Sequence, residues 1–372
     1  MRWFEIDNVD EVPSPSLLID VDRVKRNIQR MIQWCGDRGP GVLRPHVKTH
    51  KLPQIIDLKR QAGIDKFKTS TIAECEMTAE AGGTDILLAY QPVGPNLDRL
   101  LTLIERFDHS RFSTIVDCPE IAQQLAQQAH LRNLVVDVYV DLNVGMDRTG
   151  IRIGDSAEQL YRFIQESESL NAVGLHAYDG HIHHTDTSTV VKLMDEAFEP
   201  VWQWIDSIRQ RGLVVPKVVG CGTPTSELML QRSVDFDIEV SAGTSVLWDA
   251  GQPTFSPPME FENAALVLGR VISRPTEQTL CIDVGHKSVG SEMQPPRIIF
   301  QGLEDASFVM QSEEHLVLKT ERAQQYGIGH VFYGAPIHVC PTVALYDHAW
   351  CVKDGKAIER WPIVARARRI TI

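Results

Sequence analysis

One stretch near the start of the sequence, Leu43-Arg44-Pro45-His46-Val47-Lys48-Thr49-His50-Lys51, concentrates basic and imidazole side chains directly after an apolar run. If that run is a strand, Lys48 lies at its carboxyl end, partly desolvated among cationic neighbours. Both effects lower the pKa of an amine, and only the neutral amine is nucleophilic. The stretch therefore predicts a lysine that forms a Schiff base, with a basic surface turn as the alternative.

Glycine and hydroxyl residues follow two later apolar runs, at Gly222-Thr223 and at Gly243-Thr244. Loops of this composition bind phosphate through backbone N–H groups and hydroxyls. Arg148, in a Gly-x-x-Arg-x-Gly turn, can donate hydrogen bonds to a ring oxygen or a carboxylate, or form a salt bridge. Tyr178 can stack on an aromatic cofactor, or be a half-buried core residue. A lysine opposite two phosphate-type loops is a more specific signal than any of these features alone.

Two histidine-containing stretches are candidates for a metal site. The first holds His176, His181, His183 and His184, where the alternative is one ligand among solvated neighbours. The second is His338-Val339-Cys340, which we expect on a strand, where side chains two residues apart share a face. An imidazole and a thiolate on one face bind zinc or a similar divalent ion and leave coordination positions for water or substrate. The alternative for this stretch is a buried histidine and cysteine in a small β core.

The elements that position these residues alternate between strand-like and helix-like segments from residue 42 to residue 242. Eight β/α units in about 230 residues are the size of a (β/α)8 barrel, the TIM-type fold, whose active sites lie at the carboxyl ends of the strands. A doubly wound open sheet is the alternative, but no G-x-G-x-x-G motif follows an early strand. Because proline is awkward inside a central strand, we expect an irregular strand end around Pro45. The strand-like runs are 42–48, 66–70, 85–90, 112–117, 135–143, 172–178, 217–222 and 237–242, and the helix-like segments are 52–62, 72–81, 96–107, 119–130, 156–167, 187–211 and 226–233.

Before residue 42 and after residue 250, the predicted elements no longer alternate regularly between strand and helix. A short strand at 17–20 precedes a helix at 21–36, which Asp20 can cap. After residue 250, strand-like runs without long helices predict a small antiparallel β domain. We therefore expect a barrel domain over residues 17–250 and a β domain over residues 251–372 together with residues 1–16. The later runs are 264–272, 279–284, 298–300, 315–318, 338–343 and 349–352.

Composition narrows the class of protein. The 372 residues carry a net charge of -12, and no long basic run is present, so nucleic acid and anionic membranes are not expected partners. The seven cysteines are scattered without a C-x-x-C pair, which favours a reducing cytoplasm. The first ten residues are polar and acidic, unlike a signal peptide, and no apolar run has the length of a membrane span.

Taken together, these stretches resemble the fold-type III pyridoxal-phosphate enzymes, and within them the metal-activated D-threonine aldolase and D-serine dehydratase group. The resemblance covers nearly the whole chain and includes Asp283-x-Gly285-x-Lys287. It implies an alanine racemase-like barrel in which Lys48 carries pyridoxal 5'-phosphate as a Schiff base. It also implies a divalent metal, zinc or manganese, at His338 and Cys340. The other residues that it places at the cofactor are His46, Arg148, Tyr178, Gly222, Thr223, Gly243 and Thr244.

The resemblance implies a lyase for D-β-hydroxy amino acids, with cleavage of D-threonine to glycine and acetaldehyde as the main interpretation. Dehydration of D-serine or D-3-hydroxyaspartate to a keto acid and ammonia is the alternative, because the dehydratases of the group use His-x-Cys at the metal and some aldolases use His-x-Asp. His181, His183 or His184 would be the general base. By the same analogy we expect a homodimer. A racemase or decarboxylase on the same barrel would need no metal pair, and a cofactor-carrying protein without catalysis would lack the C-terminal β domain.

Overall fold

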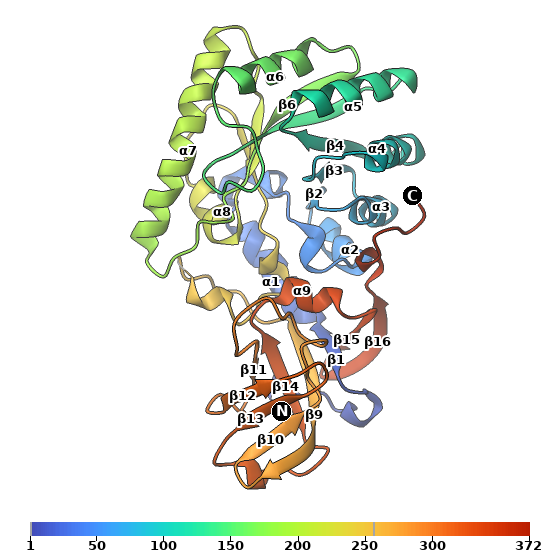
Figure 1. The fold of residues 1–372 in the computed structure, drawn as a ribbon, viewed down its shortest axis with the longest axis vertical. Helices are drawn as coiled ribbons and strands as arrows, with labels where there is room; N and C mark the ends of the chain where they lie inside the picture. Colours follow the sequence, from blue (N-terminus) through green and yellow to red (C-terminus); the bar gives the residue numbers. More distant parts are fainter. Residues whose placement is uncertain (1, 256) are drawn as a thin grey trace.

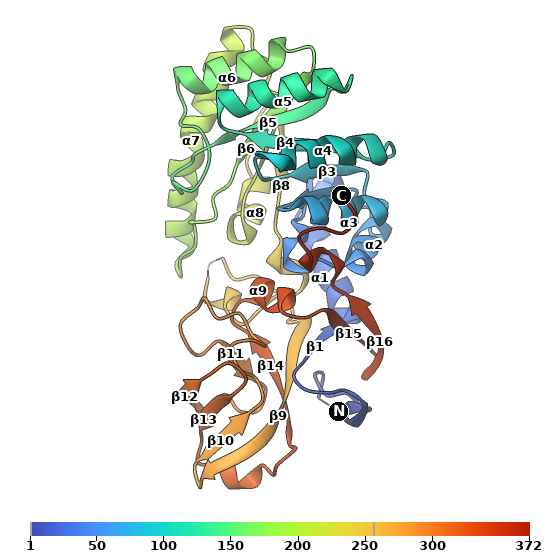
Figure 2. The same ribbon diagram turned by 45° about the vertical axis from the view of Figure 1, so that its right-hand side comes forward.

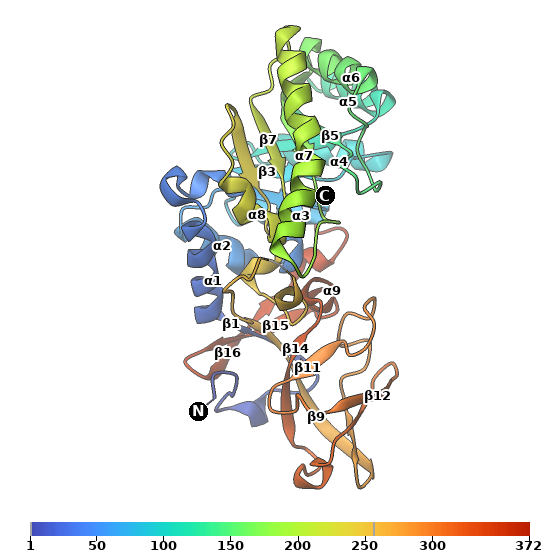
Figure 3. The same ribbon diagram turned by 90° about the vertical axis from the view of Figure 1, so that its left-hand side faces the viewer.

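The computed structural model describes residues 2–255 and 257–372. Within them the chain forms one parallel sheet surrounded by helices and, at the other end of the molecule, a second sheet that is mostly antiparallel (Figures 1 and 3). The predicted α/β class with a separate β-rich part is confirmed. No helix in the described residues combines the length and the hydropathy of a membrane span.

The parallel sheet has the strand order β2-β3-β4-β5-β6-β7-β8, so each strand pairs with its neighbours in the sequence. This is the pattern expected when every crossover is a helix that packs on the outside of the sheet. The strands are β2 (Lys66–Thr69), β3 (Asp85–Leu88), β4 (Arg111–Val116), β5 (Val136–Leu142), β6 (Leu170–Ala177), β7 (Lys217–Gly220) and β8 (Asp237–Val240). The helices are α1 (Val21–Gln33), α2 (Pro53–Gln61), α3 (Ile72–Glu80), α4 (Pro95–Arg106), α5 (Pro119–Leu131), α6 (Asp155–Glu166), α7 (Thr187–Gln210) and α8 (Thr223–Leu230).

Helix α1 illustrates why these helices form where the sequence predicts them. The Asp20 carboxylate accepts a hydrogen bond from the Arg23 N–H at 2.9 Å, which satisfies one free donor of the first turn. Val24, Ile28 and Met31 then recur at three- and four-residue spacing and are all buried. Most of the other predicted helices agree with the structure to within two residues at each end.

The predicted first strand at 42–48 does not form, and the eight-stranded barrel is confirmed only in part. The segment lies between β8 and β2 but makes isolated bridges only, Leu43 to Val240 and His46 to Lys68. The backbone groups on either side form hydrogen bonds within two 3-10 turns, Pro40–Val42 and Val47–Thr49. Pro45 has no N–H that could donate to a neighbouring strand. The described residues therefore contain a seven-stranded parallel sheet. The lysine-bearing segment lies between its two outermost strands, β2 and β8.

The second sheet has the order β12-β13-β10-β9-β1-β15-β16, with β14 pairing with both β9 and β11. The strand predicted at 17–20 forms, but it belongs to this sheet, where it pairs antiparallel with β9 and parallel with β15. The strands are β1 (Ser16–Asp20), β9 (Ala265–Thr276), β10 (Thr279–Ile282), β11 (Ile298–Phe300), β12 (Ser307–Gln311), β13 (Leu316–Lys319), β14 (Val331–Pro336), β15 (His348–Lys353) and β16 (Lys356–Pro362).

The strand predicted at 338–343 is wrong. These residues form the N-cap and most of the helix α9 (Val339–Ala344), which lies at the junction of the two parts of the molecule (Figures 1 and 2). Pro341 is accepted in a first helical turn, where its missing N–H costs nothing. The buried Asp249 carboxylate accepts the Val339 N–H at 3.0 Å and fixes the helix start.

A buried ion cluster joins the amino-terminal ends of the parallel strands to the lysine-bearing segment. Arg44, with no exposed side-chain surface, donates to Glu239 at 2.6 Å and to Asp85 at 2.7 Å. Lys66 and Lys217 reach the other Glu239 oxygen at 2.6 and 3.0 Å. Burial opposes the charged carboxylate, but the charges of Arg44, Lys217 and Lys66 outweigh it and lower the pKa of Glu239 to about 2.

Replacing Glu239 with alanine should lower the free energy of unfolding by about 3–5 kcal/mol, because Arg44 would be left as a buried charge with only Asp85. The folded pKa lies below the unfolded value of about 4.3, so this stabilisation is present above pH 4.3 and is lost as the pH falls toward 2. Denaturant unfolding of both proteins between pH 7 and pH 3 measures this. Glu196→Ala, which removes an exposed ion pair with Lys192, should change stability little. An equal loss in both variants would contradict the prediction.

Candidate active site

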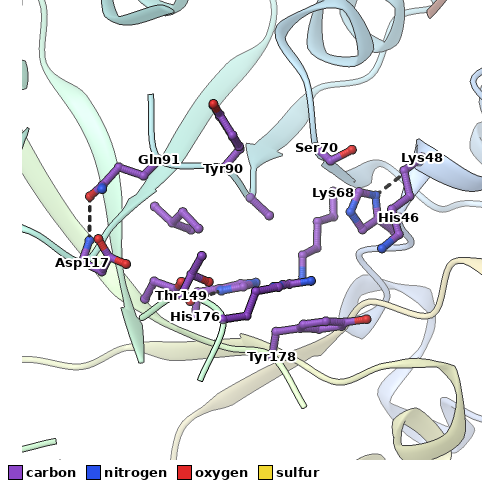
Figure 4. Close-up of a pocket in the computed structure, with 14 residues that line it drawn as sticks. His46, Lys48, Lys68, Ser70, Tyr90, Gln91, Asp117, Thr149, His176 and Tyr178 are labelled. Atoms are coloured by element: carbon purple, nitrogen blue, oxygen red, sulfur yellow. Dashed lines mark hydrogen bonds and ion pairs between the residues drawn. The ribbon is translucent and has the colours of Figure 1, made fainter. Parts of the chain in front are cut away.

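A cavity at the carboxyl ends of the parallel strands has two lobes that share His46, Lys48 and Tyr178. The first, which we call lobe A, has a volume of about 360 Å³ and is shown in Figure 4. The second, lobe B, has a volume of about 380 Å³. Lobe A is lined by residues that include Lys68, Ser70, Gln91, Asp117, Arg148 and His176, and lobe B by residues that include His183, Gly222, Thr223, Gly243, Thr244, His338 and Cys340.

Lys48 lies where the two lobes meet, in the 3-10 turn Val47–Thr49. Its backbone N–H donates to His46 Nδ1 at 3.3 Å, so that ring nitrogen carries no proton. Burial, and then the charge of Lys48, lower the pKa of His46 well below its usual value. His46 is therefore a neutral imidazole that holds the turn, and the Lys48 side chain is free to enter the cavity.

The other lysines of the predicted motifs lie elsewhere. Lys51 forms an ion pair with the buried Glu74. Lys287 is largely exposed and forms an ion pair with Glu313 at 2.5 Å. Neither lines the cavity in the described residues, whereas Lys48 and Lys68 do.

The two predicted phosphate loops face Lys48 from lobe B. Gly222 and Thr223 begin helix α8, whose first N–H groups are oriented for an anion. At Gly243, a Cβ atom would stand 3.1 Å from both His46 Cβ and Thr49 Oγ1, so a side chain there would push the loop away from the lysine turn. The Ser241 hydroxyl is buried and has no hydrogen-bond partner in residues 2–255 and 257–372. These features fit the phosphate of the expected cofactor.

Tyr178, predicted to contact the cofactor, presents its ring to three cations. The ring centroid lies 4.9 Å from Arg148 Cζ, 5.0 Å from Lys68 Nζ and 5.8 Å from Lys48 Nζ. Each arrangement is a cation–π contact, and together they give lobe A a positive wall. Arg148 and Tyr178 thus both line the cavity, and their contact with the cofactor stays a prediction.

Three buried polar groups lie beside this wall; His176 belonged to a predicted metal site, whereas Asp141 and Asp179 were given no role. His176 Nδ1 and Asp141 Oδ1 are 2.6 Å apart, and the Asp141 charge fixes the proton on Nδ1. Asp179 accepts hydrogen bonds from the Gly222 N–H at 2.7 Å and the Thr225 hydroxyl at 2.5 Å, which holds the phosphate loop in place. The available signal was that Asp141 and His176 lie near the ends of β5 and β6 and that Asp179 closely follows β6.

The three predicted base candidates occupy different environments. His183 lines lobe B, and its ring packs on Phe255 with the centroids 5.0 Å apart. His181 is not among the lining residues of either lobe; its Nε2 would be 3.3 Å from a Cβ at Gly145. His184 accepts the Asp186 N–H at 3.1 Å, just before α7. The structure therefore brings His183 alone of these three to the cavity wall.

The predicted metal residues also line lobe B. Cys340 Sγ is 3.2 Å from Thr49 Oγ1, next to the lysine turn, and His338 Nδ1 is 2.5 Å from Glu292 Oε1. Burial raises the pKa of the Cys340 thiol, but the hydrogen bond and charge of His338 outweigh it and lower that pKa. No group of three histidine, cysteine, aspartate or glutamate side chains in the described residues is arranged to hold a metal ion. The pair thus offers two ligands and a carboxylate that can orient the histidine.

Comparison with known proteins identifies the family and several similar chains. Residues 19–247 match the alanine racemase N-terminal domain family, and residues 264–352 match a serine dehydratase domain family. The chain is 28% identical to D-threonine aldolase from an Arthrobacter species, over 97% of this chain and 94% of that protein. It is 25% identical to D-threo-3-hydroxyaspartate dehydratase from Delftia, over 95% and 98% of the two chains. The crystal structure of D-threonine aldolase from Filomicrobium marinum superposes with a TM-score of 0.89 at 28% identity, over 98% and 97% of the chains.

Proposed function

The chain belongs to the alanine racemase N-terminal domain family, and from this premise we propose that it is a pyridoxal 5'-phosphate-dependent lyase of the D-threonine aldolase type. The expected reaction converts D-threonine to glycine and acetaldehyde. One observation carries the proposal: Lys48, the two phosphate-type loops and the His338–Cys340 pair all line the same lobe of the cavity.

The cofactor would be held by this chain's own residues. Lys48 would bind it covalently through its amine, with Gly222, Thr223, Gly243 and Thr244 at its phosphate. Tyr178 and Arg148 would contact its ring. When bound, pyridoxal 5'-phosphate supplies the electron sink for the pair of electrons released at Cα.

A divalent metal ion would be held by His338 and Cys340, and it supplies charge stabilisation to a hydroxyl oxygen. A thiolate ligand favours zinc over manganese, which prefers oxygen ligands. Glu292, at His338 Nδ1, would keep the other ring nitrogen directed at the metal.

His183 is the base that we assign to the β-hydroxyl proton, because it lines lobe B with the metal pair. Its ring stays in place through its contact with Phe255. His181 would then be a supporting residue rather than a group that contacts substrate.

Dehydration is the second candidate, because Cys340 stands where some aldolases of the group have aspartate. In that reaction Lys48 would take the Cα proton, and a keto acid and ammonia would leave. The relative from Delftia, a 3-hydroxyaspartate dehydratase at 25% identity, shows that this chemistry occurs among similar chains.

Product analysis with D-threonine and D-serine decides between the two. Glycine and acetaldehyde from D-threonine are expected, with little keto acid from D-serine. Pyruvate and ammonia from D-serine, without glycine from D-threonine, would replace the aldolase with the dehydratase. Racemisation alone, insensitive to chelators, would contradict both.

The proposal extends to the organisation of the enzyme. We propose a cytoplasmic homodimer of chains with a barrel domain over residues 17–250 and a β domain over residues 251–372 with residues 1–16. Strand β1 (Ser16–Asp20) lies at this boundary: it pairs in the second sheet, although most of it falls within the barrel range, and it leads directly into α1. Light scattering at micromolar concentration tests the dimer.

A further inference from the structure

We propose that Lys68 binds the α-carboxylate of the amino-acid substrate in lobe A. The inference rests on the proposed function only in taking the substrate to be an amino acid whose amine reacts where Lys48 stands. It concerns a residue to which no role has been assigned above.

The burial of Lys68 and its unpartnered amine favour binding of a negatively charged ligand. Its side chain is only 2% exposed, and its Nζ has no hydrogen-bond partner in the part of the chain that the structure describes. In Figure 4 it reaches into lobe A between Lys48 and His176, with the Tyr178 ring beside it. Burial, and then the charge of Lys48, lower the pKa of Lys68 to about 7. An unpaired buried ammonium is costly, and a carboxylate ligand would remove that cost.

The nearby carboxylates of the chain pair with groups other than Lys68, although Asp141 Oδ2 has no hydrogen-bond partner in the described residues. Asp141 pairs with His176 at 2.6 Å. Asp179 accepts from Gly222 and Thr225. Both charges act on Lys68 at a distance, but neither side chain forms a hydrogen bond with its amine in the described residues. The position is left for an external anion.

The cofactor phosphate does not account for this position, because its loops line lobe B. The substrate carboxylate does. It is attached to the carbon that bears the amine, so it must lie close to the end of Lys48, and Lys48 lines both lobes. A charge-assisted hydrogen bond from Lys68 would hold it in lobe A.

This assignment also gives a reason for selecting one hand of the substrate. With the amine at Lys48, the carboxylate in lobe A and the β-hydroxyl at His338 and Cys340 in lobe B, three substituents of Cα have fixed places. Only one configuration at Cα then presents the side chain to the metal pair.

The test is equilibrium binding of D-alanine and D-alaninamide to the holoenzyme, followed through the cofactor absorbance. Neither ligand has a β-hydroxyl, and they differ in the carboxylate. Lys68→Met should weaken D-alanine binding about ten- to a hundredfold, the value of a hydrogen bond to a charged group, and leave D-alaninamide nearly unchanged. Lys68→Arg should recover part of the loss. Binding of pyridoxal 5'-phosphate to the apoenzyme should stay close to that of the wild type.

Lys66→Met is the matched control, because Lys66 lies on the same strand at the opposite end and pairs with Glu239; it should leave both affinities unchanged. Equal weakening of the two ligands, or a large loss of cofactor affinity, would overturn the proposal. If Lys68→Met does not fold, Lys68→Gln provides the same comparison. Since binding is measured without turnover, failure to cleave D-threonine would count against the lyase and not against this subsite.

Discussion

Replacing Lys48 with alanine is expected to lower turnover of D-threonine by about 10⁴-fold or more, because the variant loses the group that would bond the cofactor. In the wild type, borohydride should fix the cofactor to the protein, and peptide mass analysis should place the adduct on Lys48. In Lys48→Ala no fixed adduct should form, while the phosphate loops retain some non-covalent affinity.

Lys68 is the rival for the covalent bond, since the described lining of the cavity contains no other lysine besides Lys48. An adduct on Lys68, or full turnover by Lys48→Ala, would contradict the assignment. Lys287→Ala is the control: this lysine belongs to the Asp283-x-Gly285-x-Lys287 motif, but its ion pairs with Glu313 and Glu314 lie away from the cavity. In Lys287→Ala, as in the wild type, borohydride should fix the cofactor to Lys48.

Local patterns explain why most of the fold could be predicted. A helix such as α1 has its cap, Asp20, and its buried stripe within one stretch of sequence, so nothing distant is needed to identify it. The loop residues of the site could be found because strands of a parallel sheet end at the same edge, which turns sequence position into spatial position.

Two errors arose where tertiary contacts outweigh local pattern. The run at 42–48 is apolar enough for a strand, but Arg44 forms ion pairs with Asp85 and Glu239. Pro45 also interrupts the hydrogen bonds that a strand would form with its neighbours. The run at 338–343 alternates like a strand, yet Asp249, ninety residues earlier, accepts the Val339 N–H and starts a helix. His338 and Cys340 remain neighbours because a helix start and its first turn also bring them together.

The burial and the partners of individual side chains could not be predicted from the sequence. Lys66 and Lys68 are two residues apart on β2 and look equivalent in sequence, but one pairs with Glu239 at 2.6 Å and the other is buried at the cavity without a partner. That difference depends on which end of the strand faces the site, and it separates a stabilising residue from a candidate ligand contact.

Removing the metal is expected to abolish turnover while the cofactor remains bound. If His338 and Cys340 hold a divalent ion at the substrate hydroxyl, EDTA or His338→Ala should lower turnover by about 10²- to 10³-fold or more, since a metal supplies several kcal/mol of charge stabilisation. The cofactor absorbance should persist, because Lys48 and the phosphate loops are untouched. Metal content measured on the same samples links the loss of turnover to the ion.

Graded variants of the pair make this prediction sharper. Glu292→Gln should weaken metal affinity by about tenfold, because the carboxylate at 2.5 Å from His338 Nδ1 orients the ring. Cys340→Asp should keep a metal but shift preference from zinc toward manganese, since an oxygen ligand replaces sulfur. His315→Ala, an exposed histidine in the same part of the chain, should change neither metal content nor turnover. Full activity of the metal-free enzyme would overturn the assignment of His338 and Cys340.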